Sequence, residues 1–132
     1  KEHVQKEGCF FLQNLIVVSE DVIHDVVKSG VVPIVLTAMS NHAGNSELEE
    51  AVCGLMSNLG LEEETKIKVG KAGAIPLLLS VLEKGDEMTN QAACAALHRL
   101  ASGCPENREI LTASGGVRAA IGVMKSIPHD DA

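Results

Sequence analysis

The fold is decided by the stretch Ala72-Gly73-Ala74-Ile75-Pro76-Leu77-Leu78, because similar stretches lie before and after it in the chain. The earlier one reads Ser29-Gly30-Val31-Val32-Pro33-Ile34-Val35, and the later one, which lacks the proline, reads Ser114-Gly115-Gly116-Val117-Arg118-Ala119. Gly30, Gly73 and Gly115 are separated by 43 and 42 residues. A fixed period near forty residues indicates stacked structural repeats and not one ordinary globular core.

The composition predicts one domain with an aliphatic core. The chain has 132 residues, of which 45% are hydrophobic, and its aromatic residues are Phe10 and Phe11 alone. The core must therefore consist of Leu, Ile, Val, Ala and Met side chains, which suit closely packed short helices.

The formal net charge of −7 narrows the classes of partner. Nucleic acids are held mainly through Lys and Arg on phosphates, so we expect no nucleic-acid partner. An anionic membrane surface is disfavoured for the same reason, whereas a basic or neutral protein surface is the better electrostatic match. No apolar stretch reaches the length that spans a bilayer, and we expect no signal peptide.

Helical periodicity predicts an all-α chain of about eight helices with no strands. Their order is long helix, short helix, glycine, middle helix and long helix again. The predicted long helices cover 2–18, 46–59 and 87–102, and the short ones cover 20–28, a stretch ending near Lys71, and 106–113. Middle helices are predicted up to about Asn41, over 74–84 and over 117–126.

Residues that favour helix ends support these bounds. Ser19 is predicted as the N-cap of the second helix, and Ser46 as the N-cap of the helix that follows 42–45, with Glu49 completing a capping box. Pro33 and Pro76 fall in the first turn of a middle helix, where a missing N–H has little cost.

The predicted long helices share a pattern. It reads Cys9-Phe10-Phe11-Leu12-Gln13-Asn14-Leu15, then Cys53-Gly54-Leu55-Met56-Ser57-Asn58-Leu59, then Cys94-Ala95-Ala96-Leu97-His98-Arg99-Leu100. Together with the short helix, the glycine turn and the early Pro, this pattern resembles the armadillo repeat family. The phrase Glu106-Asn107-Arg108-Glu109-Ile110-Leu111 is similar to the family's first helix. The resemblance covers essentially the whole chain and implies a right-handed α–α superhelix, a solenoid of three-helix repeats.

We divide the chain into a partial repeat 1–28, repeats 29–71 and 72–113, and a partial repeat 114–132. It opens on a third helix, closes on a second helix and begins at Lys1. We therefore expect it to be a piece of a longer protein.

The resemblance implies that the third helices line a concave groove that binds a peptide or protein. Aligned positions on one helix face give the candidate partner-binding residues Lys6, Phe10, Gln13, Asn14, Glu50, Ser57, Asn58, Gln91, His98 and Arg99. Asn14 and Asn58 are expected to bond a partner's backbone. The opposite side is predicted as core, with Leu12, Leu15, Met56, Leu59, Leu97 and Leu100. The alternative is a solvated polar face on which each Asn holds its own repeat together.

Family members that bind extended basic peptides carry a Trp four residues before this Asn. Here the position holds Phe10, Gly54 and Ala95, which argues against recognition of nuclear-import signals. The small residues predict a shallow, open groove floor that a helix or a bulky side chain can enter.

The cysteines favour buried, reduced thiols. Cys9, Cys53 and Cys94 are at equivalent repeat positions, about 10 Å apart and too distant for a disulfide. Cys94 and His98 have metal-ligand spacing, but two ligands do not make a site, so we expect no metal. Cys104, beside Pro105 in a loop, is predicted as the exposed thiol. Reduced thiols indicate an intracellular protein, in the cytoplasm and also the nucleus.

An acidic cluster brackets the second long helix, with Glu47, Glu49 and Glu50 before it and Glu62, Glu63 and Glu64 after it. It is either a solvated surface or a patch for a basic segment of a partner. At the two ends of the chain, Val4, Ile121 and Ile127 are expected to face water, because terminal repeats lack neighbours. We therefore predict weak homodimerisation through the exposed terminal repeats.

The sequence carries none of the motifs of hydrolases, zinc proteases or nucleotide-binding enzymes. We expect no enzyme activity and no cofactor. The leading hypothesis is a protein–protein interaction scaffold that uses the concave third-helix face. The alternative is a structural or self-assembly segment that contacts neighbouring repeats or copies of itself.

Overall fold

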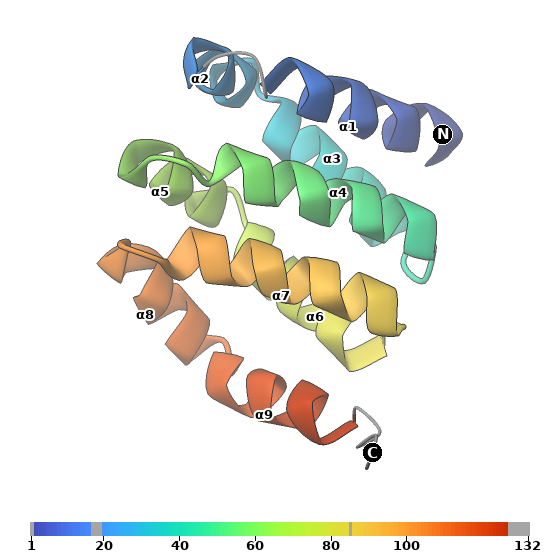
Figure 1. Ribbon diagram of the computed structural model, residues 1–132, viewed down its shortest axis with the longest axis vertical. Coiled ribbons are helices and arrows are strands. Elements are labelled where there is room, and N and C mark those ends of the chain that lie inside the picture. Colours follow the sequence, from blue (N-terminus) through green and yellow to red (C-terminus); the bar gives the residue numbers. More distant parts are fainter. Residues whose placement is uncertain (1, 17–19, 85, 127–132) are drawn as a thin grey trace, which may run out of the picture.

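The computed structural model describes residues 2–16, 20–84 and 86–126 (Figure 1). These residues form nine helices and no strand, and each helix corresponds to one of the ranges predicted above, although their number was put at about eight. The helices are α1 (Glu2–Ile16), α2 (Glu20–Lys28), α3 (Val31–Asn41), α4 (Ser46–Leu59), α5 (Glu63–Lys71), α6 (Ala74–Lys84), α7 (Glu87–Ala101), α8 (Pro105–Ala113) and α9 (Gly116–Ser126).

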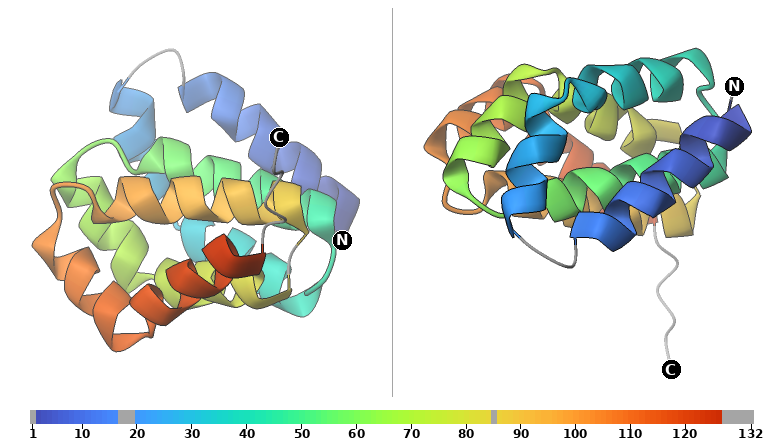
Figure 2. Two further views of the ribbon diagram at one scale, coloured as in Figure 1. Left: turned by 60° about the horizontal axis from the view of Figure 1, so that its bottom comes forward. Right: turned by 90° about the horizontal axis from the view of Figure 1, so that it is seen from above.

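The long helices α1, α4 and α7 lie side by side in one row, as Figures 1 and 2 show. The middle helices α3, α6 and α9 form a second row behind them, and the short helices α2, α5 and α8 close one edge. Each group of short, middle and long helix repeats the same arrangement. The predicted all-α, armadillo-type solenoid is therefore confirmed.

Glycine turns join each short helix to the middle helix that follows it. Gly30, Gly73 and Gly115 have φ of 83°, 97° and 85°, in the left-handed region that favours glycine. A Cβ at any of the three would meet no atom within 4 Å. The backbone conformation, and not a lack of space, therefore requires glycine here.

The helix ends follow the prediction except at α4. Its N-cap is Asn45 and not Ser46, because the Asn45 side chain accepts a hydrogen bond from the Leu48 N–H at 3.1 Å. Glu49 is buried, and its carboxylate accepts from the Gly44 N–H at 3.4 Å instead of closing a capping box. Ser19 lies outside the described residues, as does the predicted end of the first helix.

The core is aliphatic, as predicted, and runs without a break along the stack. Its largest fully buried side chains include Leu48 and Leu55 of α4, Leu78 of α6 and Leu100 of α7. Glu49, Thr65, Thr89 and Asn107 are the buried polar residues of the described chain. Among them, Asn107 of α8 donates to the carbonyl oxygens of Lys66 and Leu100 at 2.8 and 2.9 Å.

Among the described residues, a single helix long and apolar enough to cross a membrane does not occur. The helices α2 and α3 reach that length and composition only as a pair, with a bend of 65° between them. The buried side chains of α3 pack in the core.

Candidate functional site

The predicted partner-binding residues lie on the row of long helices. We call this surface the third-helix face, defined by the ten candidate residues of α1, α4 and α7. None of the ten is fully buried, and Phe10, Asn14, Gln91, His98 and Arg99 are exposed. The residues predicted as core are buried at Met56, Leu59, Leu97 and Leu100 and partly buried at Leu12. The side chain of Leu15 lies outside the described residues.

Two of the ten candidates make contacts inside the chain. The Lys6 ammonium donates to Glu47 at 2.7 Å and forms an ion pair with it. The Gln13 amide donates to the Ala51 carbonyl oxygen at 3.1 Å. Both contacts bind α1 to α4, so these side chains join the helices and do not stand open to a partner.

The groove floor at Gly54 is not open, contrary to the prediction. A Cβ added at this position would lie 2.9 Å from Oε1 of Gln13. The small residue at position 54 thus makes room for a side chain of the neighbouring helix. Ala95, the equivalent residue of α7, is exposed.

Where α4 packs beside α7, each helix carries one polar side chain that has no partner among the described residues. Within the described part of the chain, the side chains of Asn58 and Arg99 make no hydrogen bond or ion pair, and Asn58 is only partly exposed. Among the described residues, the Asn58 amide therefore makes no hydrogen bond within its own repeat, whereas the alternative of a solvated polar face stays open beside a binding role.

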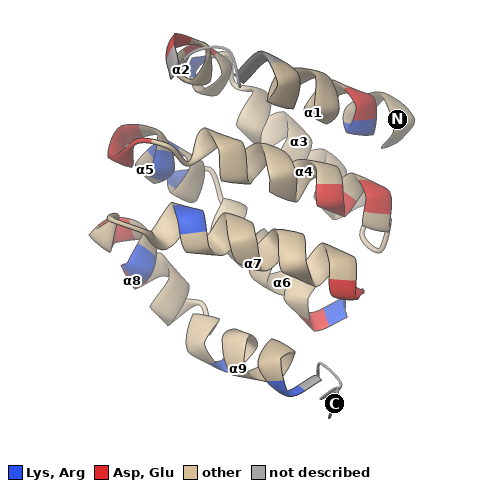
Figure 3. Cartoon of the chain, viewed as in Figure 1, with Lys and Arg blue, Asp and Glu red and all other residues tan. Residues whose placement is uncertain are grey.

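Charge on the third-helix face is divided between its two edges, as Figure 3 shows for the acidic and basic residues of α4 and α7. Glu47 lies in the first turn of α4, followed by Glu50, and Glu87 lies in the first turn of α7. His98 and Arg99 lie in the last turn of α7. The face is acidic where these helices begin and basic where α7 ends.

The predicted acidic cluster is not one patch. Its two halves lie at opposite ends of α4, roughly 20 Å apart along the helix. Several of its carboxylates are engaged within the chain: Glu47 with Lys6, Glu62 with His24 at 2.9 Å, and Glu64 with Lys68 at 3.3 Å. The hydrogen bond from Lys6 lowers the pKa of Glu47 below its ordinary value.

The four cysteines are free thiols, as predicted. Burial raises the pKa of Cys9 to about 11 and, with a smaller contribution from Glu49, that of Cys53 to about 12. Cys104 is buried and not exposed; it is the N-cap residue of α8, and its backbone N–H donates to the Ala101 carbonyl oxygen. The described residues hold no group of three or more His, Cys, Asp or Glu side chains placed to bind a metal ion.

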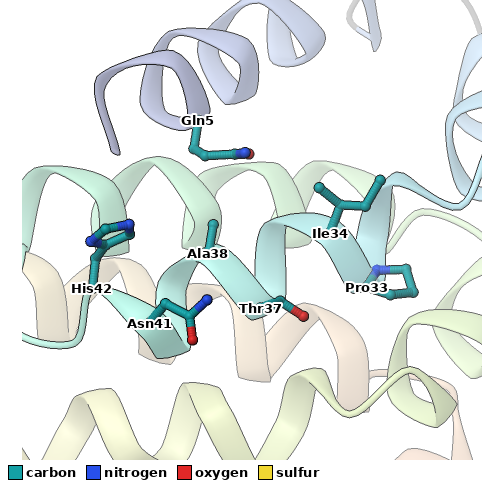
Figure 4. Close-up of a pocket in the computed structure, with 7 residues that line it drawn as sticks. All are labelled: Gln5, Pro33, Ile34, Thr37, Ala38, Asn41 and His42. Atoms are coloured by element: carbon teal, nitrogen blue, oxygen red, sulfur yellow. The ribbon is translucent and has the colours of Figure 1, made fainter. Parts of the chain in front are cut away.

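One feature was missed from the sequence. An open hollow of about 420 Å³ lies between α1 and α3 (Figure 4). Gln5 of α1 lines one side of it. The other side is lined by residues of α3 and the residue after it, which are Pro33, Ile34, Thr37, Ala38, Asn41 and His42. Ile34 is 56% exposed there, whereas Leu77, the residue after the proline of α6, packs against the core. Comparison of the repeats could have marked this position, but not the shape of the hollow.

Comparison with known proteins agrees with this geometry. Residues 63–102 match the family model described as Armadillo/beta-catenin-like repeat, and this range contains α5, α6 and α7. The chain is also similar to Importin subunit alpha-1b of Oryza sativa subsp. japonica, with 29% identity over 97 residues, which are 72% of this chain and 18% of that protein. The chain thus spans less than a fifth of the length of this relative. The predicted resemblance is confirmed, because residues 63–102 match the armadillo repeat model and lie within an all-α, armadillo-type solenoid.

Proposed function

We propose that the chain is a protein–protein interaction scaffold that binds a peptide or protein along the third-helix face, at the step between α4 and α7. The observation that carries the proposal is that the Asn58 amide on α4 and the Arg99 guanidinium at the equivalent position of α7 both lack a hydrogen-bond or ion-pair partner among the described residues. An amide offers both donors and an acceptor, and an extended peptide brings one N–H and one C=O per residue that need partners.

The proposed partner is an extended segment with charges of both signs. Its positive end faces Glu50 and Glu87 at the start of α4 and α7, and its negative end faces His98 and Arg99. About 18 Å of helix separates Glu87 from Arg99. An extended peptide covers this distance with roughly five or six residues.

The small side chain of Ala95 gives the partner a place for one large side chain. Ala95 is exposed, and Gln91 and Arg99 lie one turn to either side of it on the same face of α7. The equivalent place at Gly54 is filled by Gln13. We therefore expect one anchoring side chain per partner, at Ala95, and not a row of them.

For the test, ten-residue peptides are first selected from a random displayed library by their binding to the unmodified 132-residue chain. Their affinity for the double variant N58A/R99A is then compared with that for the unmodified chain. Loss of two polar contacts of about 1 kcal/mol each should weaken binding by at least about tenfold. The matched control is N41A/R108A, which removes the same two residue types from exposed positions on α3 and α8. Unchanged affinity in N58A/R99A would sink the proposal.

We also propose that the face does not hold basic nuclear-import signals, although the chain is similar to an importin subunit. The positions of the expected Trp row are Phe10, Gly54 and Ala95, and Gln13 covers the second of them. A lysine-rich import-signal peptide in the same assay should bind no tighter than a scrambled peptide of equal charge. Tight, sequence-specific binding of the signal would contradict this.

We likewise propose that the chain divides into repeats at the glycine turns. We also propose a location in the cytoplasm and the nucleus. Free thiols with raised pKa values fit a reducing compartment. A self-assembly role is the second candidate, because large apolar side chains are exposed at both ends of the stack.

A further inference from the structure

A side-chain amide of the chain itself occupies the surface at Gly54. A Cβ at Gly54 would lie 2.9 Å from Oε1, 3.1 Å from Nε2 and 3.2 Å from Cδ of Gln13, so the whole amide group of Gln13 lies against this glycine. The same group donates from Nε2 to the Ala51 carbonyl oxygen, earlier in α4, at 3.1 Å. The surface of α4 thus holds a primary amide between a residue without a side chain and a backbone acceptor.

The next pair of long helices repeats this surface but lacks the amide. The residues equivalent to Gln13, Gly54 and Ala51 one unit later are, in this order, Ser57, Ala95 and Ala92. The hydroxyl group of Ser57 is attached directly to Cβ, so it ends well short of the distance that the Gln13 amide covers. Among the described residues, the Ser57 side chain makes no hydrogen bond, and Ala95 is exposed.

The surface at Gly54 faces the preceding long helix, and by the repeat so does the surface at Ala95. Gln13 belongs to α1, which packs against α4, and Ser57 belongs to α4, which packs against α7 (Figure 1). Both helices of each pair are present, so the comparison concerns contacts inside the stack. One residue, glutamine in the first pair and serine in the second, distinguishes the filled surface from the open one.

From this comparison we infer that a partner fills the surface at Ala95 with a glutamine side chain, whose amide donates to the Ala92 carbonyl oxygen as the Gln13 amide does to that of Ala51. The partner's glutamine takes the position in the second helix pair that Gln13 takes in the first. The inference rests on the proposed function, because it names the side chain that anchors the same extended partner.

The chemistry of the surface favours glutamine over side chains of similar size. Glutamine carries an uncharged N–H donor at the end of a side chain long enough to reach the carbonyl oxygen. Methionine has a similar length but no donor, and glutamate presents only acceptor oxygens to another acceptor. Lysine brings a charge whose removal from water is costly.

Ala95 has a methyl group where Gly54 has none. Because a Cβ at Gly54 would lie 2.9 Å from Oε1 of Gln13, an amide at Ala95 must sit slightly farther from the helix. The glutamine of a separate peptide can move outward, whereas the Gln13 amide is tethered to α1. Reproducing the contact inside the chain therefore takes the double change S57Q/A95G.

Arg99 extends the expected recognition pattern. It lies four residues after Ala95 on the same face of α7, about 6 Å along the helix. In an extended peptide, side chains two residues apart point to the same side and lie about 6.6 Å apart. An acidic residue two positions from the glutamine therefore faces the Arg99 guanidinium.

The first part of the test uses the ten-residue peptides selected on the unmodified chain. We expect them to contain a glutamine with Asp or Glu two positions away. Replacing this glutamine by glutamate or by methionine should each weaken binding by about fivefold, because neither side chain can donate to the Ala92 carbonyl oxygen.

The second part fills the surface from within the chain. S57Q/A95G should weaken binding of the same peptides by at least about tenfold, since an amide in the same chain competes at a high effective concentration. A95G alone is the matched control and should bind within about twofold of the unmodified chain, because the surface stays open. S40Q makes the same side-chain change at an exposed residue of α3 and should also bind normally.

The outcomes separate this inference from the proposed function. If N58A/R99A binds the peptides with unchanged affinity, the proposed function fails and the inference fails with it. If N58A/R99A binds weakly but peptides without glutamine bind equally well, the function stands and the inference is overturned. The chain alone provides a further check by nuclear Overhauser effects in S57Q/A95G. The absence of contacts between the introduced amide protons and the Hα protons of position 95 also overturns the inference, since the surface would then not accept an amide.

Discussion

At the scale of single residues, Asn107 has a structural role that its polar side chain did not reveal in the sequence. Its amide donates to carbonyl oxygens on α5 and α7, and so it holds α8 against both helices. The side chain lies so close to Gly70 that a Cβ there would overlap it. Asn107 is 1% exposed, whereas Asn58 is partly exposed and makes no such bond within the described residues.

We expect N107A to lower the free energy of unfolding by about 2 kcal/mol, because two buried carbonyl oxygens lose their donor. N58A should change it by less than about 0.5 kcal/mol, since a partly exposed amide without a hydrogen bond to the described residues is removed. Urea denaturation of both variants measures the difference. Equal stability of the two variants would show that the Asn107 bonds contribute nothing.

The buried cysteines predict a loss of stability at high pH. Burial raises the pKa of Cys9 and Cys53 from 9.0 to about 11 and about 12, so the folded chain keeps these protons longer than the unfolded chain does. Their contribution is complete below pH 9 and is lost as the pH rises through the folded pKa values. Thermal unfolding between pH 8 and 11 should show a shallower decline for C53A than for the unmodified chain.

At the scale of elements, the glycines separate two physical effects. Gly73 has a φ of 97° and open space around a Cβ, whereas Gly70, three residues earlier in α5, has an ordinary φ and no space. Gly122 of α9 has an ordinary φ and open space. One residue type thus serves a turn, a close helix contact and an exposed helical position.

We expect G73A to cost about 1–2 kcal/mol of stability, because alanine must adopt the left-handed conformation. G70A should cost more, since either Asn107 or the backbone must move. G122A is the matched control and should stabilise the chain by about 0.5–1 kcal/mol, as alanine favours a helix. Denaturation midpoints in this order support the assignment, and a destabilising G122A would refute it.

At the scale of the whole molecule, burial decreases from the middle of the stack to its last helix. Eight residues of α4 are buried, whereas the large side chains of α9 at 117, 121 and 124 are exposed. In a stack of repeats, each unit is stabilised mainly by its neighbours. The last unit therefore has the least support.

Hydrogen exchange should follow this gradient. The amides of α4 and α7 should exchange only through global unfolding, and those of α9 many times faster. Uniform protection along the chain would contradict the gradient.

The amino-acid sequence was enough to predict the repeat, the helix order, the aliphatic core and the glycine turns. These depend on local spacing and on backbone preferences that neighbours in the chain impose, so Gly73 and Pro76 could be interpreted without a structure. Local preferences did not identify the N-cap of α4, because Asn45 and Ser46 are both residue types that can cap a helix. Asn45 is the N-cap, and the burial of Glu49 fixes where the helix begins.

Which side chains of a predicted face stay accessible depends on how the helices pack, and the sequence did not reveal it. Gln13 covers Gly54, Lys6 binds Glu47, and Cys104 turns inward, and each contact joins residues that pack together only after the helices have stacked. The same holds for the hollow between α1 and α3, which exists because helices far apart in sequence pair across it. A sequence pattern states which face a residue occupies, but its neighbour across the helix interface decides whether that residue meets solvent or another helix.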